Sequence, residues 1–198
     1  KYLDTIKPSM SLKKPIIYLS NSGSVSVQLT QLDSGIADNC EVSSISISRT
    51  TFNCSQLGSN LITVTASDLS GNTIIKNTTI MVKDTVKPVI VSQSANVYLT
   101  TSGVASLTTS TVNKGSYDNC KLDSVTIHKS TFNCTDLGVN QILLKVKDNS
   151  GNQSLQYVTV NVIDTVKPII NYKNVNCYLN SSGIGKISEQ DVNNGSYD

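Results

Sequence analysis

Aspartate recurs in this chain at a spacing that could build a metal site. The pentapeptide D-T-(I/V)-K-P occurs three times, while D-N-C and D-x-S-G-N each occur twice, and every motif returns after 80 residues. The final residue matches the aspartate of D-N-C, so the periodic aspartates are Asp4, Asp38, Asp68, Asp84, Asp118, Asp148, Asp164 and Asp198. Carboxylate oxygens are hard ligands of the kind that Ca²⁺ prefers, with carbonyl, amide and water oxygens completing the shell. The motifs make these aspartates candidate Ca²⁺ ligands.

The same residues also have a purely structural interpretation. Asp and Asn side chains open turns by bonding to their own backbone, and D-x-S-G-N is a good hairpin turn without any metal. Lys87 could also neutralise Asp84 or a neighbouring carboxylate. Ca²⁺ binding and plain turn chemistry both stay open at the level of the sequence.

Four of the five cysteines share the period. Cys40 and Cys54 lie 14 positions apart, and so do Cys120 and Cys134. This spacing predicts one disulfide inside each repeat, closing a 15-residue loop worth roughly 3 kcal/mol, with free thiols as the alternative. A metal site is disfavoured because the chain has no C-x-x-C and a single His. Cys177 falls at an apolar strand position, where a buried thiol is expected, or else a bond to a partner outside this sequence.

The period organises the whole chain. It predicts complete repeats at 4–83 and 84–163 and the N-terminal part of a third at 164–198, as in a slice through a longer array. Within a repeat, apolar residues alternate with period two between the turn signals SG, DN, LG and SGN. About seven strands per repeat predict an all-β fold of tandem Ig-like β-sandwiches arranged as an elongated rod. An open meander or a small barrel is the competing architecture.

The elements of such a sandwich would bring the aspartates together. The first strand starts at the same pole as the D-N-C loop and the D-x-S-G-N turn. Asp84, Asp118 and Asp148 are therefore expected to be neighbours, although they lie far apart in the sequence. Three carboxylates this close repel one another unless a cation lies between them. The Ca²⁺ hypothesis therefore predicts an ion at each joint between repeats, where it would stiffen the array, while turn chemistry remains the alternative.

Composition and motifs exclude several classes of function. A net charge of +2 over 198 residues, with scattered Lys, does not suit nucleic-acid binding. No apolar run approaches the ~18 residues that a membrane span needs. The chain has no G-x-S-x-G, H-E-x-x-H, P-loop or G-x-G-x-x-G motif, and one His cannot supply a recurring acid–base site, so no enzymatic activity is expected.

The ordered motifs D-T-x-K-P, D-N-C, F-N-C, L-G-x-N, D-x-S-G-N and V-x-D resemble those of hyalin-repeat (HYR-like) extracellular modules. More narrowly, the chain resembles the tandem repeats of giant surface adhesins from gliding Bacteroidota. The resemblance covers the whole chain and implies an extended surface protein exported by the type IX pathway. Asp-Ser/Thr-aliphatic triplets also resemble the O-glycosylation motif of that group, which makes candidates of Thr5, Thr85, Thr165 and Ser124.

Repetition with intact joints is typical of a structure selected for length and spacing. The sequence therefore predicts an extracellular structural stalk of a large cell-surface adhesin, and the predicted disulfides agree with an oxidising compartment. Its partners would be neighbouring repeats of the same chain, with a surface or polysaccharide ligand held by other regions. One alternative is that the repeats themselves bind glycans multivalently through exposed aromatic residues such as Tyr117 and Tyr197, which the first repeat lacks. Another is that they are spacer modules of a secreted enzyme.

Overall fold

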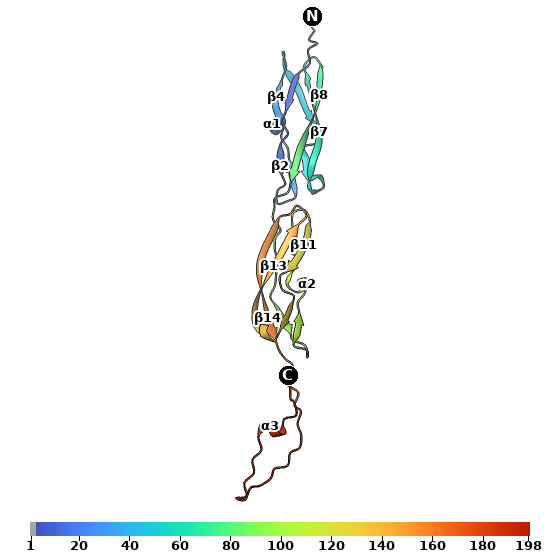
Figure 1. Ribbon diagram of the computed structural model, residues 1–198. Helices are drawn as coiled ribbons and strands as arrows, with labels where there is room; N and C mark the ends of the chain where they lie inside the picture. Colours follow the sequence, from blue (N-terminus) through green and yellow to red (C-terminus); the bar gives the residue numbers. More distant parts are fainter. Residues whose placement is uncertain (1–2) are drawn as a thin grey trace. The chain divides into compact units, whose positions relative to one another are not determined.

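The computed structural model describes residues 3–198 (Figure 1). They divide into two compact units. The first holds the described residues up to Val91 together with Gly115–Thr126 and Lys145–Leu155, and the second holds Ser92–Lys114, Ile127–Leu144 and Gln156–Asp198. These units do not follow the predicted repeat limits, because the D-N-C and D-x-S-G-N turns of the second repeat group with the first repeat. The limits themselves stay a prediction.

The first repeat contains eight strands and two short helical turns. They are β1 (Ser9–Leu12), β2 (Ile16–Tyr18), β3 (Ser24–Ser26), α1 (Leu29–Leu32), β4 (Asp33–Ala37), β5 (Val42–Ile47), β6 (Thr51–Asn53), the 3₁₀ turn η1 (Cys54–Gln56), β7 (Gly58–Asp68) and β8 (Thr73–Lys83). One sheet has the order β2-β8-β7-β5, and the pairs β1-β4 and β3-β6 complete the sandwich. The predicted all-β, Ig-like sandwich class is confirmed, with one strand more than expected in this repeat.

Strict alternation along the long strands builds the core. In β7, Ile62, Val64 and Ala66 are at most 1% exposed, while the residues between them are only partly buried. Phe52 from β6 and Leu32 from α1 pack into the same apolar cluster. Fully burying a side chain of this size contributes about 1.5–3 kcal/mol, so the alternation fixes which face of each strand turns inward.

In each of the two repeats one strand pair departs from the antiparallel pattern that the turn signals predict. β2 runs parallel to β8, with Ile17 opposite Val82. The chain first pairs with β4 through β1, and then crosses at Pro15 to the edge of the four-stranded sheet, where the Pro15 carbonyl accepts the N–H of Met81 at 3.0 Å. Proline has no N–H to donate to a ladder, so it suits this crossing between sheets.

The second repeat follows the same plan. Its elements are β9 (Ala95–Tyr98), β10 (Val104–Ser106), α2 (Thr109–Val112), β11 (Leu122–Ile127), β12 (Thr131–Asn133), the 3₁₀ turn η2 (Cys134–Asp136), β13 (Gly138–Asp148) and β14 (Gln153–Ile163). The strand order β11-β13-β14-β9 and the pair β10-β12 match the first repeat. Phe132, Leu144 and Val160 are at most 1% exposed and occupy the positions of Phe52, Val64 and Ile80.

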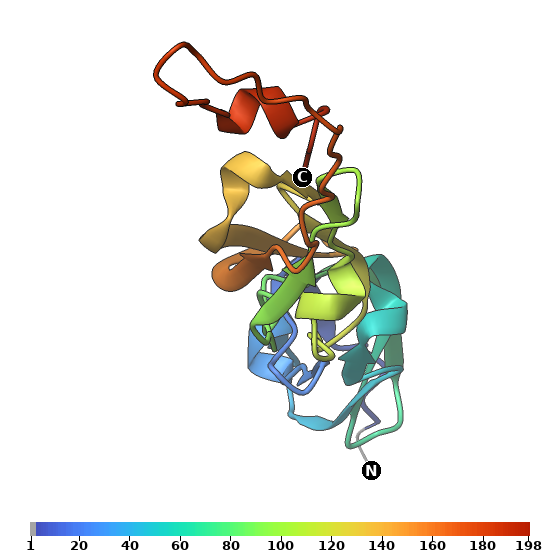
Figure 2. The same cartoon turned by 90° about the horizontal axis from the view of Figure 1, so that it is seen from below.

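Residues 164–198 carry the beginning of a third repeat. They contain α3 (Glu189–Val192), drawn as the short red helix in Figure 2, and two isolated bridges, one joining Ile169 to Tyr197. Cys177 is exposed in this segment, so the expectation of a buried thiol is wrong here. The matching Val97 lies in β9, which pairs with β14, whereas no strand among the described residues pairs with the segment around Cys177.

Candidate metal centres and the disulfide beside them

Three carboxylates meet at the start of the second repeat, and all three belong to the first compact unit. Asp84 follows β8, Asp118 lies in the turn before β11 and Asp148 ends β13. One ligand oxygen of each lies within 4.8 Å of the other two. This set, the Asp84 triad, is the convergence that the sandwich topology predicts.

Strand alternation explains why Asp148 is buried. It continues the inward series of Leu144 and Val146 at the last position of β13, and only 1% of its surface is exposed. Asn152 satisfies the carboxylate, because its backbone N–H and its side-chain Nδ2 each donate to one Asp148 oxygen at 2.7 Å. Asn152 therefore orients Asp148 through its amide nitrogen.

Asp84 is held by its own turn and by the two other loops of the pole. Its Oδ1 accepts the N–H of Val86 at 3.1 Å and Nδ2 of Asn119 at 3.2 Å. Its Oδ2 accepts the hydroxyl of Ser150 at 3.4 Å. Ser150 and Asn119 are thus positioning residues of the pole. Among the described residues no ion pair joins Lys87 to Asp84.

Asp118 keeps one oxygen free for a ligand. Its Oδ2 accepts the N–H of Cys120 at 3.0 Å, but its buried Oδ1 has no hydrogen-bond partner among the described residues, and the same holds for Oδ1 of Asn119. Burial raises the pKa of Asp118, and the charges of Asp148 and Asp84 add to the effect against the opposing N–H of Cys120. Unpaired buried oxygens beside two further carboxylates are a donor set that fits Ca²⁺.

A second triad of the same kind stands at the start of the first repeat. One oxygen each from Asp4, Asp38 and Asp68 lies within 4.8 Å of the others, and the buried Oδ1 of Asp38 likewise has no partner among the described residues. We call this set the Asp4 triad. Burial opposes ionisation of Asp68, but hydrogen bonds from Asn72 and Ser70 outweigh it and lower its pKa overall. The Asp4 triad is less deeply buried than the Asp84 triad, since of its members only Asp68 is buried.

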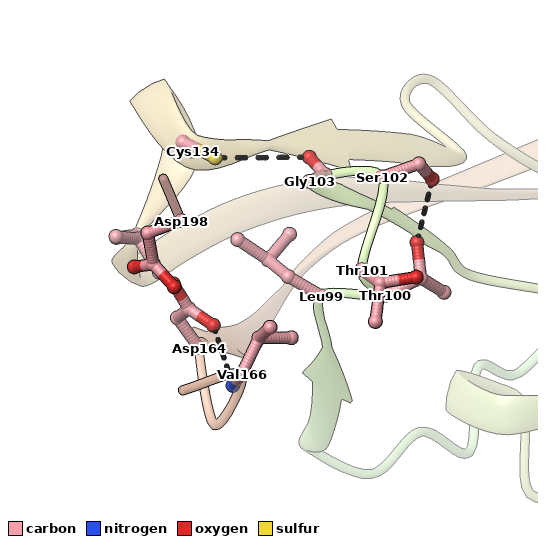
Figure 3. A pocket seen from close by; sticks show the side chains of 10 residues that line it. Leu99, Thr100, Thr101, Ser102, Gly103, Cys134, Asp164, Val166 and Asp198 are labelled. Atoms are coloured by element: carbon pink, nitrogen blue, oxygen red, sulfur yellow. Dashed lines mark hydrogen bonds between the residues drawn. The ribbon is translucent and has the colours of Figure 1, made fainter. Parts of the chain in front are cut away.

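The two remaining candidate ligands, Asp164 and Asp198, lie together in the second unit. Both line a cavity of about 470 Å³ with Cys134 and Gly103 (Figure 3). Asp164 Oδ1 accepts the N–H of Val166 at 2.9 Å, as Asp84 does with Val86. The structure therefore groups all eight periodic aspartates by repeat, while Ca²⁺ itself stays a prediction.

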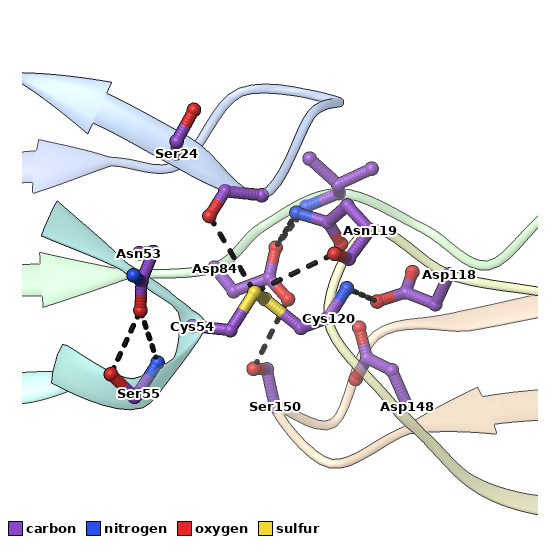
Figure 4. Close-up of a disulfide and its surroundings, with 12 residues drawn as sticks. Ser24, Asn53, Cys54, Ser55, Asp84, Asp118, Asn119, Cys120, Asp148 and Ser150 are labelled. Atoms are coloured by element: carbon purple, nitrogen blue, oxygen red, sulfur yellow. Dashed lines mark hydrogen bonds between the residues drawn. A yellow bond between two sulfur atoms is a disulfide. The ribbon is translucent and has the colours of Figure 1, made fainter.

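A disulfide joins Cys54 to Cys120, with the two Cα atoms 5.4 Å apart (Figure 4). Cys40 and Cys134 are free and exposed, so the predicted pairs Cys40–Cys54 and Cys120–Cys134 are wrong. The bond instead connects the T-F-N-C end of the first repeat to the D-N-C turn of the second.

The length of the strands explains the correction. β5 begins opposite Asp68, so Cys40 lies near the C-terminal end of β7, whereas Cys54 opens η1 just before the start of β7 at Gly58. Eleven residues of extended strand separate these ends by roughly 35 Å. A disulfide needs Cα atoms about 4.4–6.8 Å apart, so cysteines at opposite poles of one sandwich cannot pair.

The D-N-C turn of the second repeat is also seated against the Ser20–Gly23 turn of the first. Asn119 Nδ2 donates to the carbonyl of Ser20 at 3.1 Å. Gly23 has φ of 72°, and a Cβ placed on it would come within 2.6 Å of the Asn119 carbonyl oxygen and 3.1 Å of Cys54 Sγ. Only glycine fits this position, and the S-G pairs that repeat after 80 residues were the sequence signal for it.

The candidate O-glycosylation positions Thr5, Thr85, Thr165 and Ser124 are all exposed, and their modification stays a prediction. No helix in the described part of the chain is both long and apolar enough to cross a membrane.

No family model and no curated protein matches the chain. Solved structures give distant likenesses. Human protocadherin-24 EC1-2 is 12% identical with a TM-score of 0.38, over 82% of this chain and all of that one. Mouse cadherin-23 EC22-24 is 8% identical with a TM-score of 0.36, over 82% of this chain and 66% of that one. The endo-fucoidan hydrolase MfFcnA9 of glycoside hydrolase family 107 is 14% identical with a TM-score of 0.28, over 79% of this chain and 34% of that one. Because the sequence identities and TM-scores are this low, the description of the fold rests on the sheets of the chain itself.

Proposed function

We propose that this chain is an extracellular structural segment of a large cell-surface adhesin, whose repeats space a binding region from the cell and bear load without catalysis. The observation that carries the proposal is the covalent bond between Cys54 of one repeat and Cys120 of the next. Under tension, a disulfide between consecutive repeats transmits force across the joint and keeps the segment between its two cysteines from extending. It also supports an extracellular location, because such bonds persist in oxidising compartments.

Ca²⁺ at the two triads is the second part of the proposal. The support is the clustering of three carboxylates within 4.8 Å, with unpaired buried oxygens on Asp38 and Asp118. When bound, the ion would neutralise the repulsion among the carboxylates. Asp84 lies in the stretch that links the repeats, so a cation shared by Asp84, Asp118 and Asp148 would restrain that link.

Single-molecule stretching tests the load-bearing role. The disulfide joins two residues that are 66 positions apart, so the segment between them cannot extend when the oxidised chain unfolds. At about 3.4 Å per residue this is roughly 220 Å. The oxidised chain should therefore release about 220 Å less than the Cys54→Ser/Cys120→Ser variant at full unfolding, and reduction should abolish the difference. Equal lengths for the oxidised chain and the variant would overturn the role of the disulfide under load.

Calorimetry with Ca²⁺ tests the metal. Extracellular modules bind Ca²⁺ with Kd of about 10⁻⁴ to 10⁻³ M, so millimolar Ca²⁺ at a Kd of ~0.1 mM should stabilise a site by about 1.4 kcal/mol. Asp148→Asn should remove one site and Asp68→Asn the other, whereas Asp33→Asn, which lies outside both triads, should remove none. Absence of heat and of any thermal shift in the unmodified chain would reject the ion and leave turn chemistry as the role of the aspartates.

Binding to immobilised polysaccharide separates the spacer from the glycan-binding alternative. A spacer should not bind, and Tyr117→Ala should change nothing, although Tyr117 is 58% exposed. If the chain is retained on the polysaccharide, and if this retention grows with the number of repeats and is lost with Tyr117→Ala, the repeats themselves bind the glycan.

A further inference from the structure

Cys134 occupies the same local setting as the bonded Cys54. Each cysteine opens a 3₁₀ turn directly after a short strand. The preceding asparagine caps that turn in both cases, because Asn53 Oδ1 accepts the N–H of Ser55 at 2.8 Å and Asn133 Oδ1 accepts that of Thr135 at 2.8 Å. The two sulfur atoms are thus presented by the same backbone geometry.

The glycine beside each sulfur is also equivalent. Gly103 has φ of 70° and Gly23 has φ of 72°, and a Cβ on either would lie 3.1 Å from the neighbouring cysteine Sγ. Cys134 Sγ lies 3.9 Å from the Gly103 carbonyl oxygen, and Cys54 Sγ lies 3.6 Å from that of Gly23. The environments differ in one respect. Asn119 of a D-N-C turn lies next to Gly23, whereas among the described residues only Cys134 lies within 4 Å of a Cβ placed on Gly103.

The space beside Cys134 holds the aspartate that would begin such a turn. Asp198 lines the 470 Å³ cavity together with Cys134 and Asp164 (Figure 3). It matches Asp118, and Cys120, two residues after Asp118, is the residue that bonds to Cys54. In that bonded copy the Cys120 N–H also donates to Asp118 Oδ2 at 3.0 Å. The cavity is therefore lined both by the sulfur that would form the bond, that of Cys134, and by the aspartate that would place the incoming cysteine, Asp198.

We propose that Cys134 is a disulfide site for the cysteine of a D-N-C turn whose aspartate takes the place of Asp198, forming a bond equivalent to Cys54–Cys120. A small-molecule disulfide such as oxidised glutathione is the oxidant. The Cys134 thiolate attacks it and releases one thiol, and the D-N-C cysteine then attacks the mixed disulfide and releases the second. Two protein thiols together lose two electrons and two protons, and one small-molecule disulfide becomes two thiols. The proposal concerns this site alone and does not depend on the spacer role or on Ca²⁺.

Two other free cysteines serve as internal controls for the pairing. Cys40 and Cys177 are both exposed, and neither lines the cavity of Cys134. Non-selective oxidation would involve all three, whereas a built site would select Cys134.

The test uses the 198-residue chain with an Asn-Cys dipeptide added after Asp198, equilibrated in a glutathione redox buffer. Remaining thiols are alkylated and the disulfides are mapped by mass spectrometry without reduction. The added cysteine should be linked to Cys134. The yield of this link should exceed the yields of its links to Cys40 or Cys177 by on the order of tenfold or more, because the cavity raises the effective concentration of the added cysteine at the Cys134 sulfur only.

Three control chains accompany the mapping. With added Asn-Ser, Cys134 should be alkylated. With Cys134→Ser, the added cysteine should be alkylated and the Cys54–Cys120 bond should be unchanged, which shows that the variant is folded. In Cys177→Ser the yield of the Cys134 link should be unaltered. Comparable links to Cys40 and Cys177, or a fully alkylated added cysteine in a chain that retains Cys54–Cys120, would overturn the proposal.

Discussion

Removal of the disulfide by Cys54→Ser/Cys120→Ser should strongly destabilise the oxidised chain. The bond closes a loop with a sequence separation of 66. For a loop of this length the chain-entropy relation gives about 15 cal/mol/K, or about 4 kcal/mol at 25 °C, against roughly 3 kcal/mol for the 15-residue loop that the cysteine spacing predicts. Most of this loss acts through the unfolded chain, which gains freedom when the link is absent.

Urea unfolding measures the effect. With a slope near 2 kcal/mol/M, a loss of about 4 kcal/mol lowers the unfolding midpoint by about 2 M. The matched control is Cys40→Ser/Cys134→Ser, which removes two exposed free thiols and should change the free energy of unfolding by no more than about 0.5 kcal/mol. The reduced unmodified chain should unfold like the first variant.

The two pairings give opposite results in this experiment. If Cys40 were bonded to Cys54 and Cys120 to Cys134, both double variants would lose both bonds and be destabilised alike. Equal destabilisation, with peptide maps that link Cys40 to Cys54, would refute the structural argument from strand length.

Four further outcomes are expected. Gly23→Ala should cost more than Gly103→Ala in thermal unfolding of the oxidised chain. The positive φ costs an L residue about 1–2 kcal/mol in both, but only at Gly23 does the new Cβ meet a backbone oxygen at 2.6 Å; equal losses would contradict the seating of the D-N-C turn. Without divalent cations, Asp118→Asn should stabilise the chain near neutral pH. Because the pKa of Asp118 is raised in the folded state, the folded chain binds more protons than the unfolded chain at pH values between the ordinary and the raised pKa. The free energy of unfolding therefore falls as the pH rises through this range. Asp68→Asn should destabilise the chain, because a carboxylate whose pKa is lowered in the folded state stabilises that state, and this stabilisation is lost on acidification. Urea unfolding in the presence of chelator at several acidic pH values checks the direction of both pH effects. Phe52→Ala should lose about 3–5 kcal/mol in urea unfolding, since the ring is 1% exposed in the core, and a loss below 1 kcal/mol would mean that the core repacks.

Much of the fold could be read from local patterns. Alternation with period two requires only neighbouring residues, and the structure confirms it in β7, where Ile62, Val64 and Ala66 share the buried face. The convergence of Asp84, Asp118 and Asp148 could also be anticipated, because a sandwich brings the start of its first strand and two of its loops to one pole. The parallel pairing of β2 with β8 was not anticipated, since the crossing between sheets at Pro15 has no periodic signal.

The cysteines mark the limit of reading the sequence alone. The separation of 14 between Cys40 and Cys54 recurs between Cys120 and Cys134, while the separation of 66 between Cys54 and Cys120 is the remainder of the 80-residue period, so the period by itself does not choose between the two pairings. Chain distance does not give spatial distance, because an extended strand carries residues about 3.3 Å apart along a line to the opposite pole. The sequence by itself determined the period, the inward faces of the strands and the residues of the Asp triads. Only the tertiary structure decided which cysteines meet, because that depends on which pole of one repeat lies against which turn of the next.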